Sequence, residues 1–201
     1  MNVFSTAILI IFCSLLGSAF SFKCLACSSD TTQTCTGVPI DCPTDQCMTV
    51  SARSIYGTNN FASIYKSCAN TALCGAEGSI TENPELKIRV SVNCCQGTNC
   101  NTDLYNIPTE NSTPNGVNCP SAYCEDTTEP CNTDLKMMAC TGSETCCFDY
   151  RGKLKGPDKT VKDYSVKGCI SPLACKCNFK CLPQMTEIER KSLECCNKVQ
   201  P

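Results

Sequence analysis

Cysteine is the residue type that could do most chemistry in this chain. The 201-residue sequence has 23 cysteines and no histidine. Cysteine above about a tenth of a short chain is typical of a disulfide scaffold, which persists where thiols are oxidised. A structural zinc site favours paired C-x-x-C motifs, usually with histidine, whereas this chain has one such motif, at Cys24 and Cys27. We therefore predict a disulfide-rich extracellular protein that holds no metal and no cofactor.

The other reactive residue types give little support for an enzyme. Without histidine, serine and cysteine triads lack their usual proton carrier. Two carboxylate pairs are present, Asp149 with Asp163 and Glu187 with Glu189, but such pairs are usually solvated surface and nothing sets them at a defined separation. Every cysteine of the processed chain can have a partner, which leaves no free catalytic thiol. We expect a non-enzymatic protein.

Both ends of the sequence indicate secretion. Residues 1–21 hold an apolar run and end in small residues that suit a signal peptidase, so we assign them as a signal peptide. Cleavage after Ser21 removes Cys13 and leaves 22 cysteines, an even number that allows full pairing. The C-terminal residues have no apolar tail, which predicts no membrane anchor. Acidic and basic residues are nearly balanced, so nucleic acid is not an expected partner.

The remaining cysteines fall into two blocks. The first, from Cys24 to Cys100, holds ten cysteines, and the second, from Cys119 to Cys196, holds twelve. The stretch between them has no cysteine and contains the Pro, Asn and Gly residues typical of a linker. Each block is too small to depend on a hydrophobic core alone, so disulfides must carry much of its stability. The predicted boundaries are residues 22–102 for domain one, 103–118 for the linker and 119–201 for a divergent domain two.

Alternating polar and apolar residues predict β-strands in both blocks. The segments with this pattern are residues 47–52, 61–65 and 87–92 in the first block, and 147–150 and 161–166 in the second. Turn-forming residues between neighbouring segments predict hairpins. Thr186 to Cys195 has helical spacing instead and predicts one or two helical turns. The expected fold class is therefore all-β and disulfide-rich.

Two cysteine motifs bracket the first block. It opens with Cys24-Leu25-Ala26-Cys27 and closes with Cys94-Cys95-Gln96-Gly97-Thr98-Asn99-Cys100-Asn101. This pattern resembles the three-finger (snake-toxin-like) domains of the urokinase-receptor and lymphocyte-antigen family, and the match covers Cys24 to Asn101. The resemblance implies three hairpin fingers that leave a disulfide-knotted palm, with Asn101 tying the end of the domain to that palm. The implied disulfides are Cys24–Cys47, Cys27–Cys35, Cys42–Cys68, Cys74–Cys94 and Cys95–Cys100.

The second block resembles the same domain more loosely. Its best match is the run Ala139-Cys140-Thr141-Gly142-Ser143-Glu144-Thr145-Cys146, followed by a hairpin to Lys167-Gly168-Cys169. Tandem domains with this arrangement resemble the gamma-type phospholipase A2 inhibitors of vertebrate serum. The implied pairs are Cys124–Cys131, Cys140–Cys169, and Cys119 with Cys146 or Cys147. No cysteine follows Cys196, so the terminal loop of the first block cannot recur, and the remaining pairing stays open among Cys146, Cys147, Cys175, Cys177, Cys181, Cys195 and Cys196.

The resemblance implies a secreted protein-binding module that inhibits a secreted phospholipase A2 by covering it with rigid hairpins. It also allows a homo-oligomer, because gamma-type inhibitors are typically oligomers. The tandem layout and irregular second-block cysteines resemble the sodefrin-precursor-like pheromones of amphibians at least as well. A soluble modulator of a cell-surface receptor is a third alternative.

Two groups of side chains are candidates for contact with a protein partner. Tyr56, Phe61 and Tyr65 cluster near the predicted middle finger of domain one, where exposed aromatic residues would anchor a partner and packed ones would stabilise the hairpin.

Arg151, Lys153 and Lys155 belong to a basic hairpin in the second block. This hairpin could dock on an acidic partner or a lipid head group, although we favour an ordinary solvated hairpin whose lysines protect a sheet edge. Asn111, in Asn111-Ser112-Thr113, is a predicted glycosylation site in a polar stretch.

Overall fold

The computed structural model describes residues 22–56, 58–83, 86–102, 111–132, 135–155, 159–176 and 186–196. Almost all of the regular structure in these ranges is antiparallel β-strand, which confirms the predicted all-β, disulfide-rich class. The predicted signal peptide and residues 103–110 of the predicted linker lie outside the described residues. Within those ranges, no helix is long and apolar enough to cross a membrane.

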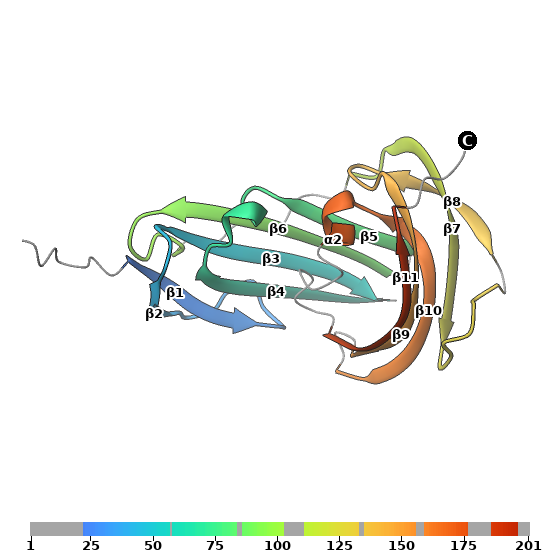
Figure 1. Cartoon of the computed structure of the whole chain (residues 1–201), viewed down its shortest axis with the longest axis horizontal. Helices are drawn as coiled ribbons and strands as arrows, with labels where there is room; N and C mark the ends of the chain where they lie inside the picture. The colour runs from blue at the N-terminus through green and yellow to red at the C-terminus, as the bar shows by residue number, and fades with distance from the viewer. Residues whose placement is uncertain are drawn as a thin grey trace, which may run out of the picture.

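The first block forms three hairpins in one sheet (Figure 1). Its strands are β1 (Phe22–Ser29), β2 (Val38–Cys42), β3 (Gln46–Tyr56), β4 (Asn59–Cys68), β5 (Glu77–Asn83) and β6 (Leu86–Gln96). The hairpins are β1 with β2, β3 with β4, and β5 with β6, and β3 also pairs with β6 while β4 pairs with β1. A short 3₁₀ turn, Thr71–Leu73, precedes β5. The strands predicted from alternation therefore form the centre of this sheet.

The second block repeats this plan with fewer described strands. Its elements are β7 (Pro114–Glu125), β8 (Lys136–Thr141), β9 (Cys146–Lys155), β10 (Val161–Ile170), the short helix α2 (Pro172–Lys176) and β11 (Thr186–Cys195). The strand β7 pairs with β8 and β10, and β9 pairs with β10 and β11. Because Pro114 pairs with Thr141 of β8, β7 begins inside the stretch that composition assigned to a linker.

The helical turns predicted over Thr186–Cys195 are wrong, because this segment is strand β11, antiparallel to β9. The register shifts at two bulges, between Glu187 and Glu189 and between Arg190 and Ser192. A bulge inserts an extra residue and reverses the alternation of faces beyond it. The apolar residues therefore do not follow the even spacing that identifies a strand in sequence.

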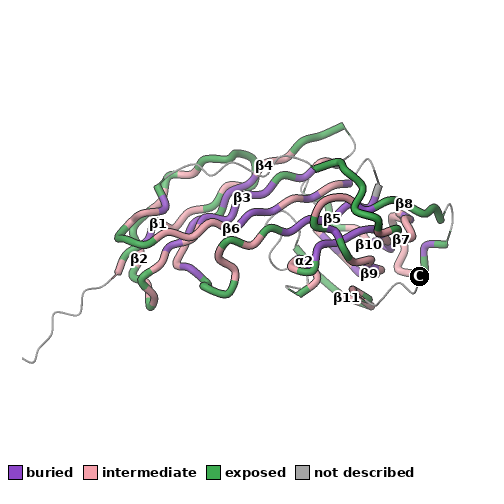
Figure 2. Tube along the Cα trace, turned by 90° about the horizontal axis from the view of Figure 1, so that it is seen from above, coloured by how far each residue is buried: buried purple, intermediate pink, exposed green. Residues whose placement is uncertain are grey.

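The two blocks share one sheet junction and one hydrophobic core. The strand β10 pairs with β5 through Cys169 with Thr81 and Ile170 with Ile80. The strands β9, β10 and β11 then run across the ends of β3 to β6 at a steep angle (Figure 1). Buried residues concentrate in the central strands and around β10 (Figure 2). The shared core comprises Val50, Ala52, Ile80, Leu86, Ile88, Val90 and Val92 of the first block with Phe148, Tyr150, Leu154, Tyr164, Val166, Ile170 and Ala174 of the second.

Two glycines permit the close crossing of these strands. A Cβ on Gly168 would lie 2.4 Å from the carbonyl oxygen of Thr81 and 2.7 Å from the Cα of Glu82. A Cβ on Gly152 would lie 2.3 Å from the carbonyl oxygen of Glu189 in β11. Backbone atoms therefore occupy the space of a side chain at both positions, which only glycine leaves open.

Disulfides tie each block internally. The first block holds Cys24–Cys47, Cys27–Cys35, Cys42–Cys68, Cys74–Cys94 and Cys95–Cys100, the same pairs that the family resemblance implies. The second holds Cys119–Cys147, Cys124–Cys131, Cys140–Cys169, Cys146–Cys196 and Cys175–Cys195. Of the two partners left open for Cys119, the structure joins Cys147. Cys177 and Cys181 lie outside the described residues.

The end of the second block is bridged differently from the end of the first. Cys175–Cys195 has the same sequence separation, 20 residues, as Cys74–Cys94 of the first block. Cys95 closes a small loop with Cys100, whereas Cys196 joins Cys146. The last bridge of the second block therefore fastens the end of β11 to the start of β9.

Candidate partner-binding surface

The palm of the first block is held by Asn101 as well as by its disulfides. The Asn101 side chain is fully buried. Its Oδ1 accepts a hydrogen bond from the Leu25 backbone N–H at 3.0 Å, and its Nδ2 donates to the carbonyl oxygens of Leu25 at 2.8 Å and Met48 at 3.3 Å. One side chain thus links the closing loop to β1 and β3, which fixes the base of two fingers.

Three clusters of cysteine sulfurs resemble metal sites in spacing alone. In each, three sulfur atoms lie within 4.8 Å of one another. The clusters are Cys24, Cys42 and Cys68; Cys119, Cys140 and Cys169; and Cys175, Cys195 and Cys196. Every member belongs to a disulfide, whereas a metal ligand must be a thiolate. These clusters are therefore groups of neighbouring disulfides that link the strands.

The three aromatic candidates differ in their surroundings. Phe61 pairs with Ser54 and Tyr65 pairs with Val50, so both lie on the face of β4 that continues into the shared core. Phe61 is half-buried, whereas Tyr65 is 40% exposed. Tyr56 ends β3, but its side chain lies outside the described residues. Tyr65 is therefore the candidate with an aromatic surface open to a partner.

The basic candidates all lie on β9, on the face opposite the core residues Tyr150 and Leu154. Arg151 Nε donates to the Ser192 hydroxyl at 2.8 Å, and Lys153 lies 3.9 Å from Asp163. Lys155 ends the strand and is half-buried.

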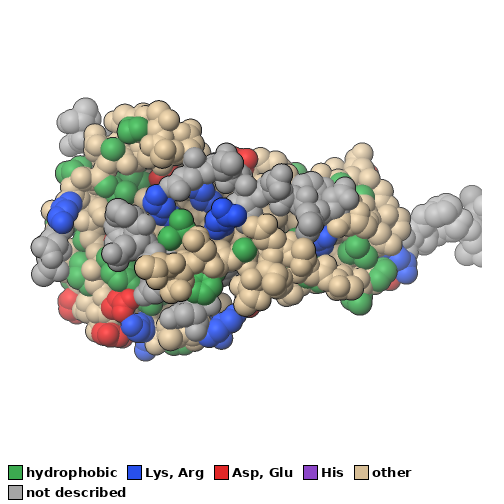
Figure 3. All heavy atoms as spheres, turned by 180° about the vertical axis from the view of Figure 1, so that it is seen from behind, with side chains coloured by type: hydrophobic (Ala, Val, Ile, Leu, Met, Phe, Trp, Pro, Cys, Tyr) green, Lys and Arg blue, Asp and Glu red, His purple; other side chains and the backbone are tan. Residues whose placement is uncertain are grey.

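The same face also carries the pair Lys167 with Asp149, at 2.6 Å. Acidic and basic side chains lie next to one another at one end of the second block (Figure 3). In the predicted basic hairpin, Lys153 and Lys167 are therefore each paired with an aspartate of the neighbouring strand.

Further polar contacts hold β7, β10 and β11 in place. Lys162 donates to Glu125 at 2.5 Å, and this hydrogen bond raises the pKa of the Lys162 ammonium. The hydrogen bond from Arg190 to Glu187 raises the pKa of the guanidinium in the same way. Burial, with a smaller contribution from Glu187, raises the pKa of the Tyr150 hydroxyl, which donates to the Glu189 carbonyl oxygen at 3.3 Å.

A polar junction between the blocks had no signal in the sequence. Glu144 is 1% exposed, and its Oε1 accepts a hydrogen bond from the Thr81 hydroxyl at 2.7 Å. The Ser171 hydroxyl accepts a hydrogen bond from the Ser79 backbone N–H at 2.9 Å. At the far end of the interface, Lys159 forms an ion pair with Asp30. These residues are 63, 92 and 129 positions apart, so no local motif could reveal their contacts.

The predicted glycosylation site lies at the surface. Asn111, Ser112 and Thr113 are all exposed, and Asn111 Oδ1 accepts a hydrogen bond from the Thr113 backbone N–H at 3.0 Å. The acceptor residue therefore lies on an exposed turn, where a glycan could be attached to its side-chain amide.

Comparisons with known proteins point to one group. No protein-family model matches the chain. It is similar to the phospholipase A2 inhibitor 31 kDa subunit of Naja kaouthia, with 29% identity over 168 residues that cover 81% of this chain and 85% of that protein. It is also similar to a phospholipase A2 inhibitor gamma subunit from Elaphe climacophora, with 31% identity over 134 residues that cover 65% of this chain and 64% of that protein.

Among solved structures, the crystal structure of mouse TEX101 aligns with a TM-score of 0.37 and 18% identity, over 86% of this chain and 97% of that chain. The resemblance to gamma-type phospholipase A2 inhibitors, predicted from the cysteine pattern, is confirmed by the two snake relatives.

Proposed function

We propose that this chain, a relative of the gamma-type inhibitors, is a secreted, non-enzymatic inhibitor of a secreted phospholipase A2. The observation that carries the proposal is the extent of the similarity. An alignment of 168 residues is longer than either cysteine block, so the likeness to an inhibitor includes parts of both.

Inhibition would be steric and stoichiometric. The chain has no histidine, and all its described cysteines are bridged, so it lacks the usual residues of a hydrolytic site. Rigid hairpins lose little conformational freedom when they bind, and this loss is a main cost of association. The disulfides and the buried polar junction between the two blocks make the free chain rigid, so little further ordering is needed on binding.

Tyr65 is the side chain that we propose as an anchor. It offers a partly exposed aromatic ring with a polar end on the middle finger of the first block. Aromatic residues of this kind dominate the energy of protein interfaces. Arg151 and Lys153 are less suitable, because a partner would have to replace the contacts that they already make with Ser192 and Asp163.

The test is a titration of purified, oxidised protein against a panel of secreted phospholipases A2, with phospholipid turnover as the measurement. We expect at least one enzyme to lose activity in proportion to the added chain, and the chain alone to release no fatty acid. Tyr65→Ala should weaken that inhibition by about tenfold or more, as expected for a hot-spot residue.

Val38→Ala is the matched control, because Val38 lies in the same block and is 64% exposed. It should leave inhibition unchanged. Full turnover by every enzyme in the panel at excess chain would reject the proposal. Equal losses for Tyr65→Ala and Val38→Ala would reject Tyr65 as an anchor.

A further inference from the structure

Two arginines stand directly opposite each other on the polar face of the first block's sheet. Arg53 of β3 pairs in register with Arg89 of β6, so both side chains project from the face opposite the core residues Ala52 and Val90. The Cβ atoms of such a pair lie about 4.5–5.5 Å apart, which lets both guanidinium groups reach one point. Like charges in this arrangement destabilise a sheet, and a bound anion would relieve their repulsion.

No acidic side chain in the described ranges forms an ion pair with either arginine, whereas several other basic residues have such a partner. The register places Glu77 opposite Ser91, diagonal to Arg89, but its carboxylate makes no ion pair there. On the other side, the buried Glu144 accepts a hydrogen bond from the Thr81 hydroxyl. The two arginine charges therefore stay uncompensated within the part of the chain that the structure describes.

Two buried polar atoms beside this pair have no hydrogen-bond partner among the described residues. They are Nη2 of Arg89 and Oγ of Ser79. Ser79 is 2% exposed and stands directly opposite Arg89 in β5, on the same face of the sheet. Buried polar atoms are almost always paired in folded proteins, so an unpaired one points to a ligand, an ion or water. Arg53, Arg89 and Ser79 thus form a row of donors across the neighbouring strands β3, β6 and β5.

The number of donors in this row indicates which anion fits. Two guanidinium groups that bind as forks offer about four N–H donors, and the Ser79 hydroxyl adds one more. A carboxylate has two oxygens, with about four lone-pair sites. A phosphate monoester presents three strong acceptor oxygens and carries about two negative charges, which match the two arginines.

The row is open at one end and enclosed at the other. Arg53 is exposed, Arg89 is half-buried and Ser79 is buried, so a small anionic group can enter beside Arg53 and be enclosed beside Ser79. The strand β3 runs toward the second block, which places Arg53 on the half of the strand nearer the junction (Figure 1).

From these observations we propose that Arg53, Arg89 and Ser79 form a binding site for a phosphate monoester group. Its source is either a soluble phosphate ester or the head group of an anionic lipid such as phosphatidic acid. Each arginine donates a pair of hydrogen bonds to the phosphate oxygens, and Ser79 donates one from the enclosed side. The inference does not depend on inhibition of phospholipase A2, because Tyr65 lies on the other face of the sheet.

The first test is isothermal titration calorimetry of the mature, oxidised chain with inorganic phosphate at about pH 8, where phosphate is a dianion. We expect one site with a dissociation constant of about a millimolar or lower. Arg53→Gln and Arg89→Gln should each raise that constant about tenfold or more, because each removes two charge-assisted hydrogen bonds. Ser79→Ala removes one neutral donor and should raise it about threefold to tenfold.

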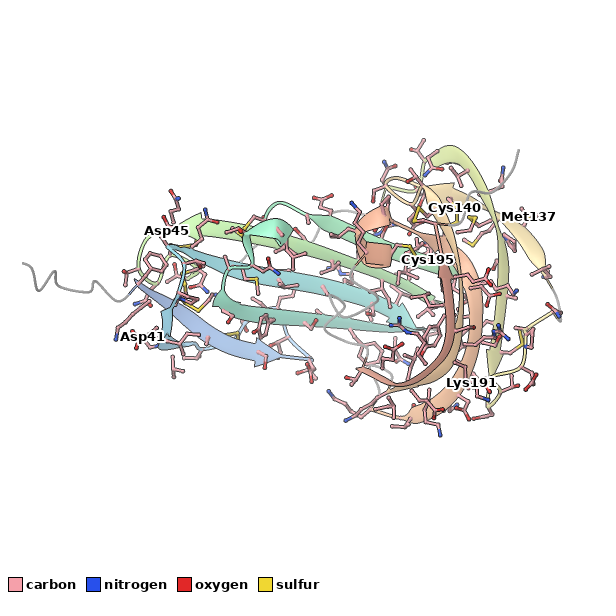
Figure 4. All side chains as sticks on the ribbon, in the orientation of Figure 1. Asp41, Asp45, Met137, Cys140, Lys191 and Cys195 are labelled. Atoms are coloured by element: carbon pink, nitrogen blue, oxygen red, sulfur yellow. A yellow bond between two sulfur atoms is a disulfide. The ribbon has the colours of Figure 1, made fainter. Side chains whose placement is uncertain are left out.

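Lys136→Gln is the matched control, because it removes the same charge from an exposed side chain of β8 in the second block. Its neighbour Met137 lies at the outer margin of the molecule, away from β3 and β6 (Figure 4). This variant should leave the affinity for phosphate unchanged. Arg53→Lys keeps the charge but loses the fork, so it should bind phosphate more weakly than the wild type.

Vesicles separate the two sources of the phosphate group. If the ligand is a lipid head group, phosphatidic acid vesicles should co-sediment with the wild type and with Lys136→Gln, but not with Arg89→Gln. Phosphate binding without co-sedimentation would identify a soluble phosphate ester as the ligand. Phosphatidylcholine vesicles, whose phosphate is a diester, should not co-sediment with the chain in either case.

Three results would overturn the proposal. The first is a chain that binds neither inorganic phosphate nor phosphatidic acid vesicles. The second is phosphate binding that Arg53→Gln and Arg89→Gln leave intact, which would place the site elsewhere. The third is acetate bound as tightly as phosphate, which would make a carboxylate of an acidic partner the ligand of this row.

Discussion

Substitution of Gly168 by alanine should separate the two blocks. The new methyl group would lie 2.4 Å from the Thr81 carbonyl oxygen and 2.7 Å from the Glu82 Cα, about 1 Å inside ordinary contact distances. Both obstacles are backbone atoms, so the strands β10 and β5 must move apart. Overpacking of this kind costs about 1–3 kcal/mol of unfolding free energy.

The separation has a second cost at the polar junction. If β5 moves, the 2.7 Å hydrogen bond from Thr81 to the buried Glu144 lengthens. A buried acceptor that loses its partner costs about 1–3 kcal/mol more. We therefore expect Gly168→Ala to lower the free energy of unfolding by about 2–6 kcal/mol if the hydrogen bond is lost, and by about 1–3 kcal/mol if the junction relaxes without breaking.

The assay is denaturation by guanidinium with the disulfides intact, followed by tyrosine fluorescence because the chain has no tryptophan. The wild type should unfold in one transition, since one core joins both blocks. Thr81→Val should cost less in the Gly168→Ala background than alone, because the bond it removes is already weakened. Additive costs, a Gly168→Ala effect below about 0.5 kcal/mol, or two separate wild-type transitions would refute the reasoning.

Four further predictions concern single features of the fold. Because burial raises the folded pKa of Tyr150, a spectrophotometric titration should show one tyrosine that ionises above the ordinary range, and this late step should be absent in Tyr150→Phe. Stability should fall as pH rises above about 10 and should fall less in Tyr150→Phe; an unchanged titration in that variant would contradict this. Asn101→Ala should lower the unfolding free energy by about 2–4 kcal/mol, measured by denaturant melts, because it removes three partly buried hydrogen bonds to the backbone of Leu25 and Met48. Replacing Cys146 and Cys196 together by serine opens a bridge with a sequence separation of 50 residues, which should cost about 4 kcal/mol and speed amide exchange in β11; unchanged exchange would place β11 under other control. Asn111→Gln should remove a glycan-sized mass from the secreted protein, and an unchanged mass would show that the site is unused.

Much of the first block could be predicted from sequence because its signals are local. The alternation of Lys87 to Val92 predicts a strand, and these residues lie in β6, whose apolar members Ile88, Val90 and Val92 enter the core. Asn101, implied by resemblance to tie the palm, makes three side-chain hydrogen bonds there. Each of these features depends on residues close in sequence or on a fixed cysteine pattern.

The second block was harder to predict because its features depend on contacts between distant residues. The bulges that give β11 its irregular spacing arise from its pairing with β9, about forty positions earlier. The pairing of Cys196 with Cys146 depends on where β11 ends in space. The charges of the β9–β10 hairpin suggested a basic surface, but Lys153 and Lys167 lie beside Asp163 and Asp149 in the folded chain.

The candidate partner-binding surface also has features that local sequence predicts and features that depend on contacts between distant residues. The sequence could indicate Phe61 and Tyr65 as neighbours on one hairpin, because a two-residue period places them on one face. It could not show that Phe61 is half-buried while Tyr65 remains 40% exposed, since that depends on how the blocks pack. The edge strand β8 was absent from the predicted strands, and its register with β7, which places Pro120 opposite Met137, could not be derived from the sequence.

We propose that this chain inhibits a secreted phospholipase A2 by binding it. The most direct measurement is active-enzyme titration: a fixed amount of a susceptible secreted phospholipase A2 is mixed with increasing oxidised chain and the residual turnover of phospholipid vesicles is recorded. We expect a linear loss of turnover that ends at a fixed molar ratio of chain to enzyme, and we expect the enzyme and the chain to co-sediment at that same ratio. Turnover that stays constant at excess chain, for each enzyme of a broad panel, would contradict it.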